Sequence, residues 1–109
     1  MDLALKAIAE PRRRAILRLV RHDELSSGEI ASRFEVTGPA ISQHLGVLKE
    51  AGLVTERRSG TRRLYRARPE GLRDLRAFLE DFWVDGLERL RAVAEQDQRR
   101  ADAHRQGDY

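Results

Sequence analysis

The sequence of 109 residues predicts a mainly α-helical fold with one small β-hairpin. Apolar residues recur at spacings of three and four over most of the chain, which is the period of an amphipathic helix. Between residues 53 and 67 the pattern changes to two short strand-like runs on either side of Ser59 and Gly60, which predicts two strands joined by a turn. The length suits one domain, which we place at residues 1–95.

Two helices are expected at the start of the chain. Residues 2–9 form a short first helix with Leu3, Leu5 and Ile8 among its apolar residues. Pro11 fits the first turn of a second helix, where its missing N–H costs nothing, and this helix continues to about Arg21. The segment HDEL at 22–25 is expected to be a connector.

The next two helices are separated by a tight turn. Ser26 and Glu29 match a capping box that opens a third helix, which extends to about Phe34. Thr37 is a suitable N-cap for a fourth helix, with Pro39 in its first turn. Gly52 is a candidate for the C-cap of this helix. Two short helices joined in this way form a helix-turn-helix pattern.

A basic hairpin and a long helix follow. Residues 53–68 contain six arginines and one glutamate, whereas the whole chain has a net charge of only +3. Such clustering is an electrostatic footprint for phosphate. The long helix begins near Pro69 and carries a leucine and aromatic stripe. Residues 96–109 are polar and aperiodic, so we expect a disordered tail there.

The composition excludes several classes of protein. The chain has no cysteine, so it has no disulfide and no thiolate metal site. No apolar run approaches the ~20 residues of a membrane span. The N-terminus lacks the apolar core and cleavage site of a signal peptide, so we expect a cytoplasmic protein without membrane contact. Ser42 and His44 diverge on a helix without paired carboxylates, which argues against an enzyme.

The order of helix-turn-helix, basic hairpin and long helix is the winged helix-turn-helix layout. The chain resembles the ArsR-type (ArsR/SmtB) bacterial transcriptional repressors over roughly residues 3–90. The resemblance rests on the order and spacing of PRRRAIL (11–17), ELS (24–26), PAISQHL (39–45), LKEAGLV (48–54) and RSGTRRLY (58–65). It implies a homodimer held by the first and last helices, a fourth helix that enters the DNA major groove, and repression of the protein's own or a nearby promoter.

The sequence departs from the metal sensors of this family. The thiol-type sensors carry a Cys-x-Cys pair where this chain has Ser26 and Gly28, and a further cysteine often lies at the position of Ala31. The second type of site uses histidines of the last helix, but residues 69–95 contain none. We therefore expect the metal-independent branch, with no cofactor and with an inducer that the resemblance does not identify.

The fourth helix keeps a small, polar face where a recognition helix must approach base edges closely. Gln43 can bond adenine, whereas Lys49 suits a phosphate. The hairpin arginines suit the DNA backbone or a narrow minor groove, although they could instead protect the sheet edge. The predicted DNA contacts are Thr37, Gly38, Pro39, Ser42, Gln43, His44, Lys49, Arg57, Arg58, Thr61, Arg62 and Arg63.

Two assignments within this interface stay open. His44 could contact DNA or pack as a structural histidine. Arg12, Arg13 and Arg14 cannot all face DNA, because successive helix residues diverge by ~100°. One is expected to form an internal ion pair and another to reach a phosphate.

The long helix has more apolar surface than a winged helix needs, which predicts a helical dimer interface. Gly86 costs ~1 kcal/mol relative to alanine within a helix, so close helix approach would account for it. The predicted interface comprises Leu3, Leu5, Ile8, Leu75, Leu79, Phe82, Trp83, Gly86, Leu87 and Leu90. The alternatives are a winged helix that binds protein or RNA, and a repressor released by a small ligand near Trp83.

Overall fold

The computed structural model describes residues 1–107, and the side chains of residues 1–103. Its elements are α1 (Asp2–Ala9), α2 (Pro11–Leu19), β1 (Leu25–Ser26), α3 (Ser27–Ala31), α4 (Gly38–Glu50), β2 (Val54–Ser59), β3 (Arg62–Ala67), a 3₁₀ turn η1 (Pro69–Leu72) and α5 (Arg73–Gly107). The chain divides into two compact units, Met1–Leu75 and the part from Arg76 onwards. The predicted order of elements, a winged helix-turn-helix, is confirmed.

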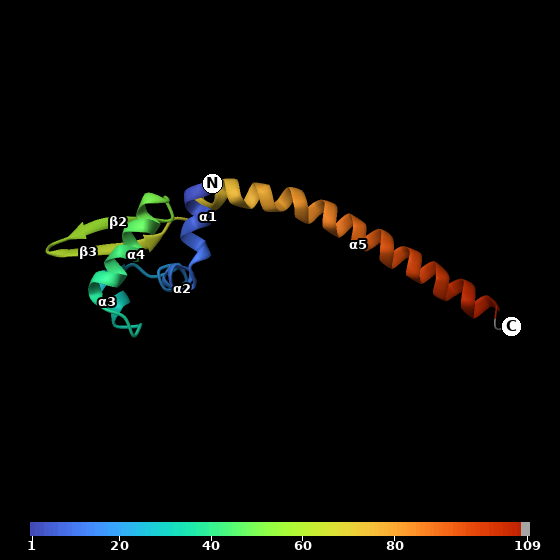
Figure 1. The fold of residues 1–109 in the computed structure, drawn as a ribbon, viewed down its shortest axis with the longest axis horizontal. Helices are drawn as coiled ribbons and strands as arrows, with labels where there is room; N and C mark the ends of the chain where they lie inside the picture. Colours follow the sequence, from blue (N-terminus) through green and yellow to red (C-terminus); the bar gives the residue numbers. More distant parts are fainter. Residues whose placement is uncertain (108–109) are drawn as a thin grey trace. The chain divides into compact units, whose positions relative to one another are not determined.

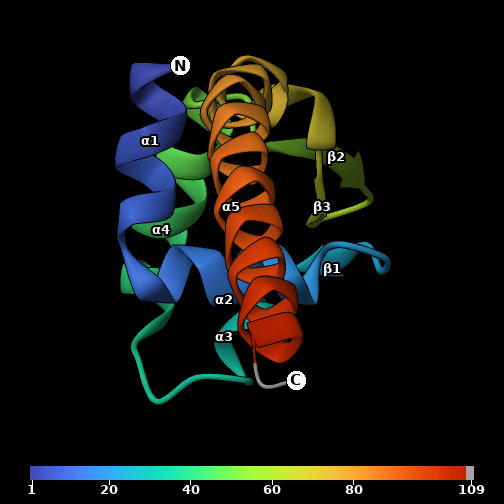
Figure 2. The ribbon, with the colours of Figure 1, turned by 90° about the vertical axis from the view of Figure 1, so that its right-hand side faces the viewer.

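In the first unit the helices and a small sheet enclose one core. β2 and β3 form the hairpin, which lies beside α4 (Figure 1). α1 lies next to α4, and α2 crosses below both (Figure 2). The buried side chains come from α1, α2, α3, α4, the sheet and the residues that flank these elements, and the largest fully buried ones are Ile16, Val20, Ile30, Ile41, Leu45, Leu48 and Leu53. Each such side chain contributes roughly 1.5–3 kcal/mol through removal from water.

Local capping signals position the helices that carry the site. The capping box is present, since Glu29 N donates to Ser26 Oγ at 3.1 Å and Ser26 N donates to Glu29 Oε1 at 3.2 Å. Thr37 caps α4, where its Oγ1 accepts from Ala40 N at 3.2 Å. Gly52 follows α4 with a φ of +75°, as a left-handed residue after a helix end should. These local predictions are confirmed.

The sheet has a third strand that the sequence pattern did not indicate. Leu25, the last residue of the expected connector, and Ser26, the predicted N-cap of the third helix, pair antiparallel with Tyr65 and Leu64. The strand order is β1-β3-β2. β1 therefore ties the start of α3 directly to the hairpin. α3 itself ends at Ala31, three residues before the predicted end, because Arg33 N and Phe34 N donate to carbonyls three residues earlier and tighten the chain into a turn.

A close backbone contact fixes the segment between the sheet and α5. A Cβ placed on Gly71 in η1 would lie 2.2 Å from the carbonyl oxygen of Gly52 and 2.8 Å from its carbonyl carbon. Arg68 Nη1 also donates to this oxygen at 3.2 Å. Only glycine fits at position 71, so η1 is held against the turn that ends α4.

The second unit contains α5 from Arg76 onwards, and this helix continues further than predicted. The expected disordered tail was placed at 96–109, yet the helix extends to Gly107, and residues 108–109 lie outside the described part. Polar pairs one turn apart support this extension, including Arg91–Glu95 at 3.3 Å and Gln98–Asp102 at 3.2 Å. Among residues 1–107, no helix combines the length and apolar character needed to cross a membrane.

Candidate nucleic-acid interface

One side of α4 is fully buried and the other is small and polar. Ile41, Leu45 and Leu48 are at most 1% exposed and anchor the helix in the core. The opposite side presents the predicted residues Thr37, Gly38, Pro39, Ser42, Gln43 and Lys49, all of which are exposed. A Cβ on Gly46, in the middle of this side, would meet nothing within 4 Å. No packing inside the described chain therefore requires a glycine at this position.

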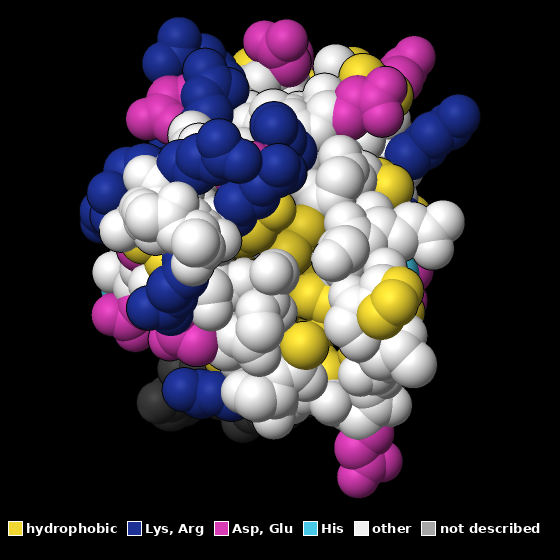
Figure 3. All heavy atoms as spheres, turned by 90° about the vertical axis from the view of Figure 1, so that its left-hand side faces the viewer, with side chains coloured by type: hydrophobic (Ala, Val, Ile, Leu, Met, Phe, Trp, Pro, Cys, Tyr) yellow, Lys and Arg dark blue, Asp and Glu magenta, His cyan; other side chains and the backbone are white. Residues whose placement is uncertain are grey.

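The hairpin beside α4 carries the basic residues. Figure 3 shows Lys and Arg side chains gathered on one half of the face that contains the hairpin tip, while most of the other half is uncharged. The predicted Arg57, Arg58, Thr61, Arg62 and Arg63 are all exposed. Arg58 and Arg63 lie directly opposite each other in the register. Like charges at such a position destabilise a hairpin. An external anion bound beside the two arginines would relieve this repulsion, which favours anion binding over a stabilising role in the sheet.

Glutamates attach one face of the hairpin to the elements before α4. Arg57 donates twice to Glu24, at 2.6 and 3.0 Å, and Arg62 pairs with Glu29. Hydrogen bonding to Arg57 lowers the pKa of Glu24, and hydrogen bonds from Ser26 lower the pKa of Glu29. Glu29 thus completes the capping box of α3 and holds the hairpin at the same time.

A further glutamate joins the opposite face of the hairpin to α4. Glu56 Oε2 accepts from Lys49 Nζ at 3.1 Å, and Glu56 Oε1 lies 3.4 Å from Arg63 Nη1. Its side chain is only 17% exposed. The hydrogen bond from Lys49 is the main cause of a lowered Glu56 pKa, and burial together with the Glu56 charge raises the pKa of the neighbouring Tyr65. Glu56 therefore links the two elements that carry most of the predicted DNA contacts.

Sequence reasoning missed these ion pairs. It treated Lys49, Arg57, Arg62 and Arg63 as free cations, whereas each has a glutamate partner. The alternation of strand residues could have placed Glu56 on the face of Tyr65 and Arg63, because cross-strand partners share a face. Nothing local indicated the partners of Arg57 and Arg62, which lie 33 residues away in the sequence.

Two arginines of α2 cap the C-terminus of α1. Arg13 donates from Nε to Ala7 O at 2.7 Å and from Nη2 to Lys6 O at 3.0 Å. Arg14 Nη1 donates to Ile8 O at 2.7 Å and to Ala9 O at 3.2 Å. The last carbonyls of a helix have no intrahelical partner, and these two guanidinium groups supply one. The expected internal ion pair is thus replaced by bonds to backbone carbonyls.

His44 faces this capping site. Its Nδ1 lies 3.4 Å from Arg13 Nη1 and 4.0 Å from Glu10 Oε2, and its side chain is 22% exposed. Glu10 also caps α2 by accepting from Arg13 N at 3.0 Å. These contacts favour the structural interpretation of His44 over a contact with DNA.

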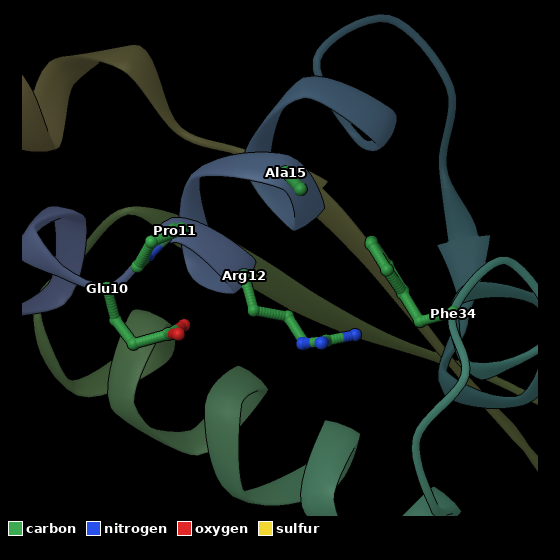
Figure 4. Close-up of a pocket in the computed structure, with 5 residues that line it drawn as sticks. All are labelled: Glu10, Pro11, Arg12, Ala15 and Phe34. Atoms are coloured by element: carbon green, nitrogen blue, oxygen red, sulfur yellow. The ribbon is translucent and has the colours of Figure 1, made fainter.

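Arg12 occupies a different environment from its neighbours. Its guanidinium carbon lies 5.5 Å from the ring centroid of Phe34, in the turn between α3 and α4. Glu10, Pro11, Arg12, Ala15 and Phe34 line an open surface pocket, in which the Arg12 side chain extends toward Phe34 (Figure 4). A cation–π contact of this kind holds the Arg12 side chain against the turn.

Comparisons with known proteins identify the family. A family model described as a helix-turn-helix domain matches residues 8–57. HTH-type transcriptional regulator Rv2034 of Mycobacterium tuberculosis is 48% identical over 86 residues, which cover 79% of this chain and 80% of that protein. A crystal structure of a possible transcriptional regulator for arsenical resistance is 47% identical, with a TM-score of 0.70 over 84% of this chain and 95% of that chain. The chain belongs to the ArsR/SmtB family of transcriptional regulators.

One ArsR-type relative of known structure is described as a homodimer. The solution structure of Mb0332 from Mycobacterium bovis is described as a homodimeric winged helix-turn-helix DNA-binding domain of a possible ArsR-family regulator. It is 33% identical to this chain, with a TM-score of 0.62 over 77% of this chain and 78% of that chain. Members of the ArsR/SmtB family are DNA-binding transcriptional regulators and not enzymes.

Most of the predicted ArsR-type dimer interface is exposed in a single chain. Trp83 is 70% exposed, and the remaining exposed members are Leu3, Leu5, Leu79, Phe82, Leu87 and Leu90. Gly86 and Ile8 are half-buried. Leu75 differs, because it is only 6% exposed and has little surface left for a partner.

The metal-sensor positions of the family have other uses here. The Ser26 hydroxyl accepts the capping-box hydrogen bond, and Gly28 lies in the first turn of α3. In the part of the chain that the structure describes, no three His, Asp or Glu side chains are grouped so that they could hold a metal ion.

Proposed function

We propose that this chain is a homodimeric, sequence-specific DNA-binding repressor of its own or an adjacent operon, without a metal-sensing site. The exposed side of α4 supports this proposal most directly. It is small and polar although the opposite side is fully buried, and it lies beside a hairpin rich in arginine. A helix that enters the major groove needs such a side, because bulky residues would hold its backbone away from the bases.

The exposed residues divide by chemistry into two groups. Ser42 and Gln43 reach base edges, since Gln can form two hydrogen bonds with adenine and Ser accepts several partners. The cations of α4 and the hairpin contact phosphates, which fix the register without reading the sequence. Thr37, Gly38 and Pro39 bring the N-terminus of α4 to a phosphate, where the helix dipole is favourable. His44 is assigned to packing because of its contacts with Arg13 and Glu10.

A homodimer would present two copies of the DNA-binding surface formed by α4 and the hairpin. Leu3 and Leu5 of α1 and the α5 stripe from Leu79 to Leu90 offer exposed apolar surface, which is costly to leave in water. Two symmetry-related α4 helices would then read a pseudo-palindromic operator with half-sites about one helical turn apart. Zinc and arsenite are expected to leave operator binding unchanged, since the thiol ligand positions carry Ser26 and Gly28.

Fluorescence anisotropy tests this function. The protein is titrated into a labelled duplex from its own upstream region and into a scrambled duplex, each at two salt concentrations. An RNA duplex of the upstream sequence separates DNA binding from the alternative of RNA binding. We expect the upstream DNA to bind orders of magnitude more tightly, with an affinity that falls steeply with salt. Equal and weak binding to all three duplexes would contradict the proposal for this promoter, and genomic fragments would then be tested.

Two substitutions separate base contacts from phosphate contacts. Gln43→Ala should weaken binding to the upstream duplex while hardly changing binding to the scrambled one, with a loss of roughly 1–3 kcal/mol for a specific base contact. Arg58→Ala should weaken binding to both duplexes alike and reduce the salt slope by about 0.9. Arg58 is chosen because, unlike Arg62, it has no ion pair among the described residues. The assignment fails if both variants lose affinity equally on both duplexes.

A further inference from the structure

Between α4 and the hairpin, two cationic side chains lie against one carboxylate. Lys49 comes from α4 and Arg63 from β3, and both direct their nitrogens at the carboxylate of Glu56, at 3.1 and 3.4 Å. Tyr65, the cross-strand partner of Glu56, is buried. Two cations from separate elements therefore converge on one oxyanion.

The three side chains differ in exposure. The Glu56 side chain is largely covered, whereas those of Lys49 and Arg63 are 56% and 57% exposed. The cations can thus reach an external phosphate without rearrangement of the core. A phosphate offers the same kind of acceptor oxygens as a carboxylate and pairs well with both ammonium and guanidinium groups.

We propose that Lys49 and Arg63 form one phosphate-binding site of the DNA interface, and that Glu56 occupies this site in the free protein as an internal competitor. This inference rests on the proposed DNA-binding function and assigns to Glu56 the role of weakening DNA affinity. In the free protein Glu56 holds both cations in place. On DNA a backbone phosphate displaces the carboxylate, so part of the electrostatic attraction is offset by the loss of two internal ion pairs.

The substitution Glu56→Gln tests this competition. The amide keeps the shape and can still accept from Lys49, but it no longer holds two cations by charge. The upstream and scrambled duplexes should both bind roughly three- to tenfold more tightly, because a phosphate contact is blind to sequence. The slope of log affinity against log salt should stay close to that of the wild type, because Lys49 and Arg63 neutralise the same phosphate in both proteins.

A matched control separates release of the cations from a simple change of net charge. Glu50→Gln removes the same charge from an exposed residue next to Lys49, and Glu50 forms none of the ion pairs found among the described residues. Its effect on DNA affinity should be clearly smaller than that of Glu56→Gln. Equal effects of the two variants would overturn the competition, as would weaker DNA binding by Glu56→Gln.

A double-mutant cycle keeps the test decisive if Glu56→Gln alters stability. Arg63→Gln is compared in the wild-type and the Glu56→Gln backgrounds, with thermal unfolding of each variant measured in parallel. Loss of Arg63 should cost more DNA affinity when Glu56 is absent, because only then is the guanidinium fully available to phosphate. Equal losses in both backgrounds would overturn the inference. If the wild-type protein binds no duplex at all, the proposed function itself fails, which is a distinct result.

Discussion

Gly71 illustrates how strongly a single residue can constrain the fold. Its missing Cβ leaves room for the backbone of Gly52, and a methyl group there would meet backbone atoms that cannot rotate away. Gly71→Ala should therefore destabilise the protein by about 1–3 kcal/mol. Urea unfolding monitored by circular dichroism measures this loss. Gly28→Ala is the control, because a Cβ at that position has only Ser26 Oγ at 4.0 Å. An unchanged midpoint for Gly71→Ala would contradict the contact.

Gly46 should respond in the opposite way. Its Cβ position is open, so Gly46→Ala should stabilise the free protein by up to ~1 kcal/mol through helix propensity. The same methyl group should reduce affinity for the upstream duplex if α4 enters the major groove closely. Unfolding and anisotropy measured on one preparation check both effects. A stabilised variant with undiminished DNA affinity would show that nothing approaches this side of α4 closely.

The functional residues could be predicted from sequence only as far as local patterns allow. The polar side of α4 follows from its buried residues at i, i+4 and i+7, because the helical period fixes the opposite side. The position of His44 did not follow, since its contact with Arg13 joins residues 31 apart in the sequence. The same limit applies to the glutamate partners of the hairpin arginines.

At the scale of elements, helices with strong end signals were predicted within a few residues. Ser26, Glu29 and Thr37 act through bonds to backbone groups three residues away, so the sequence nearby contains the whole motif. β1 was missed because two residues have no detectable alternation, and they become a strand only by pairing with β3. The length of α5 was underestimated because its last turns are polar and lack an apolar period.

The capping of α1 by α2 gives a test at this scale. Arg13→Met keeps the aliphatic part of the side chain but removes the donors to Lys6 O and Ala7 O. The variant should lose about 1–3 kcal/mol of stability, because these carbonyls lose their partners. Thermal unfolding and hydrogen exchange of the α1 amides measure the effect. Arg18→Met, on the same helix but exposed, serves as the control. Equal stability of the two variants would exclude a capping role.

At the scale of the whole molecule, acid should weaken the attachment of the hairpin. The pKa values of Glu24, Glu29 and Glu56 are lowered, so their contribution to stability is complete above the unfolded value of about 4.5. It is lost as the pH falls through the lower folded values. The melting temperature should therefore be insensitive to these groups between pH 7 and about 5 and should decline below about 4.5.

The substitution Glu24→Gln measures how much one of these three glutamates contributes to the pH dependence of the melting temperature. At pH 7 the variant should melt at a lower temperature than the wild type, because Arg57 loses its charged partner. The difference should narrow as the pH falls through the lowered pKa of Glu24, because the wild-type carboxyl then becomes protonated as well. A difference that stays constant over this range would assign the effect to packing instead of charge.

Substitutions in α5 test the proposed dimer interface. Trp83→Lys places a charge within the apolar stripe and should yield monomers in sedimentation experiments at micromolar concentration. Glu88→Lys is the control, since at 100° per residue it lies about 140° around the helix from Trp83. The monomer should also lose operator affinity, because each chain can contact only one half-site. Unchanged sedimentation of Trp83→Lys would exclude this stripe as the interface.

The double role of Glu29 has a consequence for recombination between related regulators. Because this carboxylate both starts α3 and holds Arg62, a hairpin exchanged alone between two proteins would separate Arg62 from its support in α3. The smallest portable unit therefore runs from Glu24 to Ala67. Chimaeras with crossovers outside these limits should keep their hairpin geometry, and those with a crossover between Glu29 and the hairpin should keep it only where the recipient has a carboxylate at the positions of Glu24 and Glu29.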